Sequence, residues 1–204
     1  MTCHSMPTGA PSHCRLSLME GVMEQAIVIV PGIGNSGPDH WQSHWETAFP
    51  RAARIAPESW DAPDLADWTA ALDEAVANAG APALVIGHSL GCLLFAHWHA
   101  ASARAVRGAF LVAVPDPAGP RFPVAAAAFA KLPRGRFGRV PVLAIASADD
   151  PYDPSGRALE WVTQQGATPL QLGARGHLNA ASGLGEWQEG RTLLAAFAAG
   201  LGRA

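Results

Sequence analysis

The residues best suited to chemistry are grouped around Ser89. They read Gly87-His88-Ser89-Leu90-Gly91, which fits the pattern G-x-S-x-G. In this pattern the serine sits on a sharp, strained turn, and the two glycines relieve the crowding beside it. We therefore predict that Ser89 is a nucleophile. The Leu90 N–H, at the start of a helix, is predicted to stabilise the oxyanion that forms when the serine attacks a carbonyl.

The sequence on either side of this motif supports the interpretation. An apolar run at 83–86 precedes it and predicts a buried strand, and an apolar, alanine-rich run at 90–103 follows it and predicts a central helix. This strand–turn–helix setting is the one that the pattern requires in α/β-hydrolases. The alternative is an ordinary turn serine.

The base that Ser89 needs is predicted at His177. A serine hydroxyl is a weak nucleophile at neutral pH and requires a neighbouring base. In α/β-hydrolases the residues follow one another along the chain as serine, acid and histidine. His177 is the one histidine after His99, and it lies between a predicted strand and the last predicted helix. The alternative is a histidine in a surface loop.

The acid is predicted in the run Asp149-Asp150-Pro151, directly after a predicted strand at 141–147. Either aspartate could orient the imidazole and stabilise the imidazolium. Pro151 keeps the residue before it, Asp150, out of the helical conformation. This restriction barely distinguishes the two aspartates as candidates for the acid. The residues alone therefore leave both aspartates open, with Asp153 a more distant candidate.

A second oxyanion donor is predicted in the glycine-rich loop 31–36. Glycines let the backbone approach a substrate oxygen closely, and the Ile33 N–H is favoured, with Gly34 next. The loop also matches the dinucleotide-binding pattern G-x-G-x-x-G. However, Pro38 stands where the helix would begin, and the acidic residue expected about 20 positions later is not clearly placed. No cofactor is therefore predicted.

Strands and helices are predicted to alternate from residue 26 onward. Short, wholly apolar runs indicate strands that are buried on both faces. The alternation predicts an α/β fold, a mostly parallel sheet with helices on both faces, in which ligands bind at the carboxyl ends of the strands. The strands are expected at 26–30, 53–56, 83–86, 108–114, 141–147 and 169–172, and the helices at 39–49, 64–79, 90–103, 154–165 and 187–199.

Residues 116–139 depart from this alternation. The segment is rich in proline and arginine and contains the run Ala125–Ala128. One interpretation is a solvated connection that carries one short helix. The other is a lid over the active site.

The bulk composition favours one globular domain. The chain has 204 residues, of which 49% are hydrophobic and 15% charged. The net charge is −3 and no basic run is visible, so nucleic acid and anionic membranes are poor candidates for partners. Three irregularly spaced cysteines do not suit a disulfide framework. We expect a cytoplasmic protein, since neither a signal peptide nor an 18-residue apolar run is evident.

Residues 1–24 differ from the rest of the chain. They contain all four methionines and no clear periodicity. We predict a disordered tail or a start assigned too far upstream, followed by a single domain at 25–204. The Cys-His and His-Cys pairs of this segment match no structural zinc spacing, so a zinc site there is not favoured.

His40 and His44 are four residues apart on a predicted helix, a spacing at which two side chains can share a metal ion. A metalloprotease helix would have glutamate where Trp41 stands, and no third ligand suggests itself. We therefore expect no metal, and histidines packed against polar or aromatic neighbours on a surface helix. The tryptophans at 41, 45, 60 and 68 are expected in the core or at the rim of a pocket. Cys92, inside the central helix, is expected to be inert.

With these residues assembled, the chain resembles the small serine hydrolases typified by retinoblastoma-binding protein 9 and YdeN. The likeness runs from about residue 27 to residue 201. It rests on the blocks VPGIGNSGPDHWQSHWE, GHSLGC, LVAVPDP, ASADDPYDP and GARGHLNAASGLGEW, which follow one another in this order. Several blocks in order are far more specific than the serine motif alone.

The resemblance implies a compact α/β-hydrolase with little or no cap domain. It also implies a triad of Ser89, Asp150 and His177, because the family's acid is the aspartate directly before proline. The implied activity is hydrolysis of esters or amides of small substrates. The L-x-C-x-E motif by which the vertebrate member binds pocket proteins does not carry over, because the run 90–94 lacks the glutamate and is predicted to be buried.

The combined prediction is a serine hydrolase that works through an acyl-enzyme. Ser89 attacks, His177 takes and returns the proton, Asp150 orients the imidazole, and the N–H groups of Ile33 and Leu90 stabilise the oxyanion. The alternative from another class is a non-catalytic binding or scaffold protein on the same fold. Peptidase and thioesterase chemistry would use the same residues.

Overall fold

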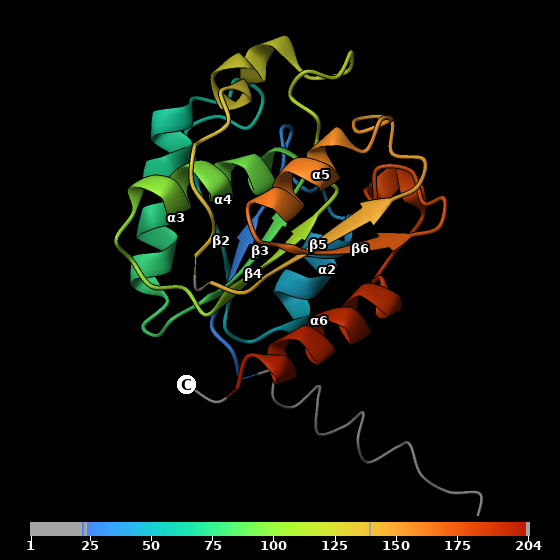
Figure 1. Cartoon of the computed structure of the whole chain (residues 1–204). Helices are drawn as coiled ribbons and strands as arrows, with labels where there is room; N and C mark the ends of the chain where they lie inside the picture. The colour runs from blue at the N-terminus through green and yellow to red at the C-terminus, as the bar shows by residue number, and fades with distance from the viewer. Residues whose placement is uncertain (1–21, 23, 139, 203–204) are drawn as a thin grey trace, which may run out of the picture.

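Six parallel strands form the centre of the molecule (Figure 1). The computed structural model describes residue 22 and residues 24–138 and 140–202. The strands lie in the order β2-β1-β3-β4-β5-β6, and every neighbouring pair is parallel. Their bounds are β1 (Ile27–Val30), β2 (Ala52–Arg54), β3 (Leu84–His88), β4 (Gly108–Val112), β5 (Val142–Ser147) and β6 (Thr168–Leu172). The predicted α/β fold with its parallel sheet is confirmed.

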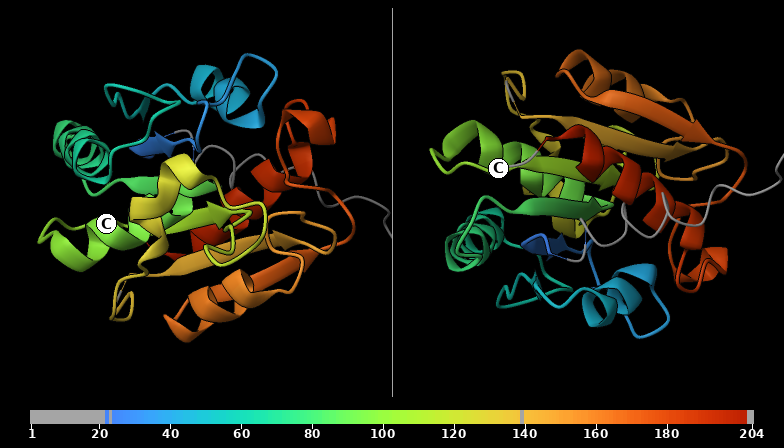
Figure 2. Two further views of the ribbon diagram at one scale, coloured as in Figure 1. Left: turned by 90° about the horizontal axis from the view of Figure 1, so that it is seen from above. Right: turned by 90° about the horizontal axis from the view of Figure 1, so that it is seen from below.

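Helices cover both faces of this sheet. The side chains of α3, α4 and α5 join one apolar core, and those of α2 and α6 join a second core across the sheet. The short 3-10 helix η1 lies at the top of the molecule in Figure 1, beyond α4, and the view from above shows it in front of the strands (Figure 2). The bounds are α2 (Trp41–Ala48), α3 (Leu65–Asn78), α4 (Leu90–Ala101), η1 (Val124–Ala130), α5 (Arg157–Gln164), η2 (Ala180–Ser182) and α6 (Gln188–Gly200).

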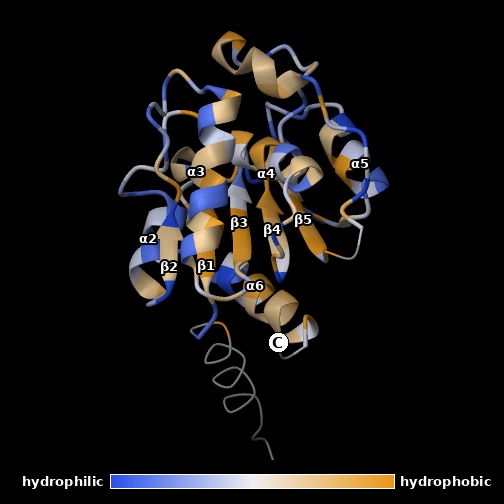
Figure 3. Cartoon of the chain, turned by 90° about the vertical axis from the view of Figure 1, so that its left-hand side faces the viewer, coloured by the Kyte–Doolittle hydropathy of each residue, from blue (hydrophilic) through white to orange (hydrophobic). Residues whose placement is uncertain are grey.

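The central strands are largely apolar because each of their faces meets a different core. In β1, Val28 contributes to the core under α3 and α4, whereas Ile29 contributes to the core over α2 and α6. Val85 and Ile86 divide in the same way in β3. Strands covered on both faces read as continuous apolar runs, and β3, β4 and β5 are correspondingly orange in the hydropathy colouring (Figure 3).

Local capping sets where the helices begin, and it shows that one predicted helix start is wrong. Helix α3 begins after Asp64, whose side chain accepts a hydrogen bond from the Asp67 N–H at 2.9 Å. Helix α5 was predicted from residue 154, which is wrong, because it begins at Arg157. Gly156 adopts a left-handed conformation (φ 72°), which a right-handed helix excludes. The Asp153 carboxylate instead accepts from the N–H groups of Ala158 and Leu159 at 3.0 and 3.1 Å.

The described part of the segment 116–139 is anchored to the body of the protein. Within η1, Ala126 and Phe129 are fully buried, and the Phe129 ring lies 5.7 Å from that of Trp68. At the start of the segment, the buried Asp116 carboxylate pairs with Arg157 at 2.6 Å. A purely solvated connection is therefore not what the chain forms here.

Helix α2 is more deeply placed than predicted. Trp41 and Trp45 are buried, and so is His40, which caps the helix by accepting a hydrogen bond from the Gln42 N–H at 3.1 Å. The expectation of a surface helix is therefore wrong for this end of α2. The tryptophan cluster explains the depth, since Trp45 stacks on Trp187 with ring centroids 5.7 Å apart.

The first described residue already belongs to the fold, because Val22 is buried in the core beside α2 and α6. The cysteine and histidine pairs of the N-terminal segment lie outside the described residues, so the boundary at residue 25 stays a prediction. Within the part of the chain that the structure describes, no helix is both long enough and apolar enough to cross a membrane. The cytoplasmic location stays a prediction.

Helix α4 begins in close contact with the end of β1. A Cβ atom placed on Gly91 would lie 2.2 Å from the carbonyl oxygen of Val30 and 2.5 Å from that of Pro31. Both neighbours are backbone atoms of a buried strand and its loop, so they cannot move aside easily. The glycine therefore allows the nucleophile-bearing turn to approach the loop after β1.

We expect Gly91→Ala to lower the free energy of unfolding by about 3 kcal/mol or more, because the added methyl group overlaps backbone atoms. Chemical denaturation with urea measures the change. Gly200→Ala is the matched control. Nothing lies within 4 Å of its Cβ position, so this substitution in α6 should leave stability unchanged or raise it by up to about 1 kcal/mol. Equal stability of the two variants would contradict the close-approach argument.

Candidate active site

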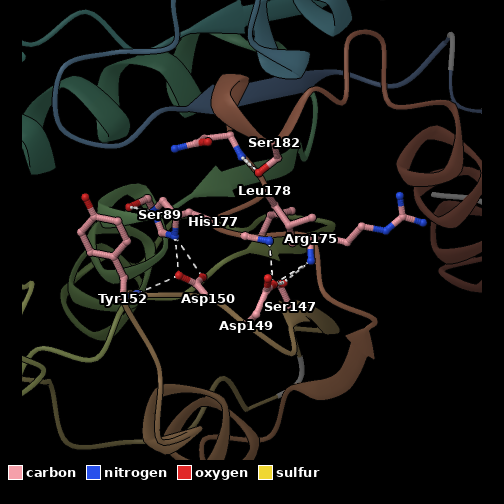
Figure 4. A network of polar contacts seen from close by, with 12 residues as sticks. Ser89, Ser147, Asp149, Asp150, Tyr152, Arg175, His177, Leu178 and Ser182 are labelled. Atoms are coloured by element: carbon pink, nitrogen blue, oxygen red, sulfur yellow. Dashed lines mark hydrogen bonds and ion pairs between the residues drawn. The ribbon is translucent and has the colours of Figure 1, made fainter.

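Three side chains from distant parts of the chain form one hydrogen-bonded line (Figure 4). The Ser89 hydroxyl donates to His177 Nε2 at 2.8 Å. His177 Nδ1 lies 2.9 Å from each carboxylate oxygen of Asp150. Both His177 and Asp150 are buried. The structure thus brings together the three residues predicted as nucleophile, base and acid.

The turn that carries Ser89 is strained, as the motif predicts. Ser89 has φ 52° and ψ −123°, a conformation that non-glycine residues rarely adopt. Its N–H still bonds the Val112 carbonyl of β4 at 3.0 Å, which anchors the turn to the sheet. Gly87 is crowded as predicted, because a Cβ there would lie 3.1 Å from the Leu111 side chain.

Gly32 makes a further close contact with this turn. A Cβ at Gly32 would lie 2.9 Å from Ser89 Cβ and 3.3 Å from Ser89 Oγ. The loop after β1 therefore touches the nucleophile itself. The glycines of this loop are predicted to let the backbone approach a substrate oxygen, and in the structure Gly32 also lies close to the serine.

The loop that carries His177 is held at its start by Asp149. One oxygen of this carboxylate, Oδ1, accepts from the backbone N–H groups of Arg175 and Gly176, each at 2.7 Å, and from the Ser147 hydroxyl at 2.8 Å. The Ser147 hydroxyl bond, followed by the Gly176 N–H, lowers the pKa of Asp149. Of the two adjacent aspartates, Asp150 thus contacts the imidazole and Asp149 holds the backbone beside it.

His88 holds the next residue of the same loop. Its Nε2 lies 3.0 Å from the backbone carbonyl oxygen of His177, and since a carbonyl only accepts, His88 Nε2 carries the hydrogen. Burial lowers the pKa of His88 well below the usual value, so the ring is neutral. His88, which precedes the nucleophile Ser89 in the sequence, therefore donates a hydrogen bond to the backbone of the base, His177.

Trp41 holds the loop one residue further on. Its indole Nε1–H donates to the Leu178 carbonyl at 2.7 Å, and both residues are buried. Leu178 has a positive φ of 49°, which places it among the strained residues of the chain. Side chains from three other parts of the chain thus fix the backbone on both sides of the imidazole.

Asp150 and His177 have one further neighbour in common. The Tyr152 N–H donates to Asp150 Oδ1 at 2.9 Å, which fixes the carboxylate. The Tyr152 ring lies 4.2 Å from the His177 ring, centroid to centroid. This residue follows Pro151 and thus extends the predicted acid loop into the site.

The two predicted oxyanion donors both lie at the site. Ile33 and Leu90 line the cavity next to Ser89. Leu90 is the first residue of α4, where an N–H has no intrahelical partner. No described residue accepts a hydrogen bond from the Ile33 N–H, whereas the Gly34 N–H already donates to the Trp60 carbonyl at 2.9 Å. This difference favours Ile33 over Gly34.

A cavity of about 240 Å³ opens beside Ser89. The loops after β1 and β6 and the strained turn form part of its wall. Phe122 and Pro123, which directly precede η1, also line it, as do Pro115 and Tyr152. The residues directly before η1 therefore lie at the site. Helix η1 is anchored by the buried Ala126 and Phe129, whereas Val124 is exposed, and a lid role for the segment stays a prediction.

The other residues that could do chemistry lie in surroundings that do not favour it. In the described ranges, no group of three or more His, Cys, Asp or Glu side chains is arranged to hold a metal ion. Cys92 is buried in α4 next to the Val112 carbonyl, and burial raises the pKa of its thiol. A neutral, enclosed thiol is a poor nucleophile. The run 90–94 is buried, as expected, which removes it from any surface contact.

Several residues of the site carry no motif of their own. From the sequence, Asp149 is only an alternative acid and Trp41 only a residue of the core or of a pocket rim. His88 stood inside the serine motif, where the pattern accepts any residue. Their partners are backbone atoms of residues 175–178, more than 20 positions away in each case. Sequence spacing carries no signal for such side-chain-to-backbone bonds.

The fold and this site define an α/β-hydrolase. The family model described as serine hydrolase matches residues 27–196, so the chain belongs to that family. A search of curated proteins gives no match. The predicted likeness to YdeN-type serine hydrolases is confirmed by the solved structures.

A YdeN-like hydrolase of Pectobacterium atrosepticum is 33% identical to this chain, with a TM-score of 0.79, and the alignment covers 93% of this chain and 97% of that one. The ydeN gene product of Bacillus subtilis is 19% identical, with a TM-score of 0.71, and the alignment covers 84% and 97%. A carboxylesterase structure from Nitrososphaera gargenis is 12% identical, with a TM-score of 0.64 and coverage of 88% and 92%. The last two support the fold alone.

We expect Asp149→Ala to lower kcat for p-nitrophenyl acetate about tenfold to a hundredfold with little change in KM. The substitution frees the Arg175 and Gly176 N–H groups, and small displacements of a catalytic group have effects of this size. Asp149→Asn keeps one acceptor oxygen and should lie between the wild type and the alanine variant. A wild-type kcat in Asp149→Ala would show that the loop does not depend on this carboxylate.

The same carboxylate predicts a pH dependence of stability. Its pKa is lowered in the folded state, so its stabilising contribution is present above a pH of about 4 and is lost as the pH falls further. The difference in unfolding free energy between wild type and Asp149→Asn should therefore shrink between pH 6 and pH 3. Urea denaturation across this range measures it, and a difference that grows toward acid pH would contradict the assignment.

Proposed function

We propose that this member of the serine hydrolase family cleaves esters or amides of small substrates through an acyl-enzyme on Ser89. The observation that carries the proposal is the line from the Ser89 hydroxyl through His177 to Asp150. The cytoplasmic location and the absence of nucleic-acid partners remain predictions beside it.

The tautomer of His177 suits a general base. The Asp150 carboxylate accepts only, so it holds a hydrogen on His177 Nδ1 and leaves the Nε2 lone pair facing the serine. As Ser89 Oγ attacks a carbonyl carbon, its proton moves to His177 Nε2 and a tetrahedral intermediate forms. The N–H groups of Ile33 and Leu90 stabilise the negative charge on its oxygen.

The remaining steps reuse the same groups. The imidazolium of His177 returns its proton to the leaving alcohol or amine, and the carbon–heteroatom bond breaks to give the ester of Ser89. A water molecule then gives a proton to His177 Nε2 and attacks this ester. Return of that proton to Ser89 Oγ releases the carboxylic acid, while Asp150 stabilises each imidazolium.

The cavity limits the substrate in size. Pockets for drug-sized ligands generally measure about 300–1,000 Å³. The cavity beside Ser89 measures about 240 Å³, which suits a small substrate. Residues such as Phe122 and Pro115 supply apolar surface to the cavity wall.

The backbone strain at Ser89 argues against the alternative function of a non-catalytic scaffold. A serine held at φ 52° costs folding free energy, and a binding protein gains nothing from that conformation. The hydrogen-bonded order of the three side chains also has no use in a scaffold.

We expect Ser89→Ala to abolish labelling by a fluorophosphonate probe and to lower kcat/KM for p-nitrophenyl acetate by at least about a thousandfold. His177→Ala should lose a similar amount. Asp150→Asn leaves the geometry near native but disfavours the required tautomer, so a loss of about 10⁴-fold is expected. Steady-state kinetics and gel-based labelling measure these effects.

Circular dichroism and thermal melting of each variant confirm that the fold is retained. Gly200→Ala, which lies far from the site in sequence and faces open space, serves as a labelled positive control. The proposal fails if a folded Ser89→Ala protein reacts with the probe as the wild type does.

A further inference from the structure

His40 is a buried histidine in the wall of the cavity beside Ser89. The residue is 4% exposed, and it lines the cavity together with Ser89 and His177. The proposed hydrolytic steps leave it without a role. Its position directly before α2 gives it a structural task, since it is the N-cap of that helix.

The capping bond fixes the tautomer of His40. The Gln42 N–H donates to His40 Nδ1 at 3.1 Å, so this nitrogen carries a lone pair. Burial, followed by the positive charge of Arg54, lowers the pKa of His40 to about 4. The ring is therefore neutral at physiological pH, and its single ring hydrogen sits on Nε2.

This Nε2–H has no acceptor among the described residues. The rings nearest to it are those of His88 and Trp41, at centroid distances of 4.7 and 5.3 Å, and neither forms a hydrogen bond with it. A buried donor without an acceptor costs folding free energy, and such groups are rare in folded proteins. A bound substrate that supplies an acceptor would satisfy it.

The rest of the cavity limits the chemistry of that substrate. None of the described residues that line it is Asp, Glu, Lys or Arg. A charged group on the substrate would therefore lose its water without meeting a counter-ion in the cavity wall, since Arg54 is already paired with Glu46 and donates to Asn35. Two amide side chains, Asn35 and Asn179, are among the polar groups that line the same cavity, and amides suit uncharged oxygen-containing groups.

We propose that His40 is a substrate-binding residue whose Nε2–H donates a hydrogen bond to an acceptor oxygen in a short, uncharged acyl group. This inference rests on the proposed acyl-enzyme function of Ser89. We assign the acceptor to the acyl group and not to the leaving group. His40 is enclosed, and the acyl group stays bound to Ser89 while the alcohol or amine departs.

The test compares esters that differ by one oxygen atom. p-Nitrophenyl methoxyacetate and p-nitrophenyl butyrate form one pair of equal length, and the 3-methoxypropionate and valerate esters form a second. For each pair, the ratio of kcat/KM for the oxygen-containing ester to that for the carbon ester defines an oxygen preference. The ratio cancels effects of a variant that apply to all esters.

Two variants separate the two nitrogens of His40. In His40→Asn the amide oxygen can replace Nδ1 as the helix cap, but the Nε2–H is lost. In His40→Gln the amide nitrogen can replace the Nε2–H, but the cap is lost. We expect His40→Asn to keep its melting temperature and to lower the oxygen preference about fivefold or more in at least one pair. His40→Gln should melt at a lower temperature and keep more of the preference than His40→Asn.

A wild-type oxygen preference in folded His40→Asn, for both pairs, would overturn the proposal and leave His40 with its capping role. The same outcome follows if both variants lose the preference in proportion to their loss of stability. Hydrolysis of any of the four esters that Ser89→Ala abolishes supports the proposed function independently. Hydrolysis that persists in Ser89→Ala would instead contradict the proposed function itself.

Discussion

The geometry of the site depends on hydrogen bonds from side chains to the backbone of residues 175–178. This loop has no regular secondary structure before η2, so no ladder of backbone bonds fixes it. Asp149, His88 and Trp41 fix it instead, from the loop after β5, the end of β3 and the start of α2. The imidazole reaches both Ser89 and Asp150 because its backbone is held on each side. A base in a free loop would lose this alignment, and with it the benefit of proximity.

A second constraint is the close approach of the loop after β1 to the strained turn after β3. Gly32 touches Ser89, and Gly91 touches the carbonyl of Val30. These contacts bring the Ile33 N–H and the Leu90 N–H to one cavity. The same arrangement therefore strains Ser89, packs α4 on β1 and places the oxyanion donors. It is possible because β1 and β3 are parallel neighbours in the sheet.

Burial decides the roles of the histidines around the cavity. His88 and His40 are neutral because desolvation disfavours their charged forms, and each therefore has one donor nitrogen and one acceptor nitrogen. His88 uses its donor on the protein, whereas the donor of His40 has no acceptor in the described chain. Only His177 has a carboxylate against its ring, and this is the histidine in line with the serine.

The alternation of apolar strands with helices, the G-x-S-x-G motif and the order of serine, aspartate and histidine could all be predicted from the sequence. They are local patterns, set by which faces must be buried and by the glycines that a sharp turn needs. The separation of Asp149 from Asp150, the depth of α2 and the start of α5 came only from the tertiary structure. Each depends on which distant backbone group or ring a side chain meets, and spacing along the chain carries no record of that contact.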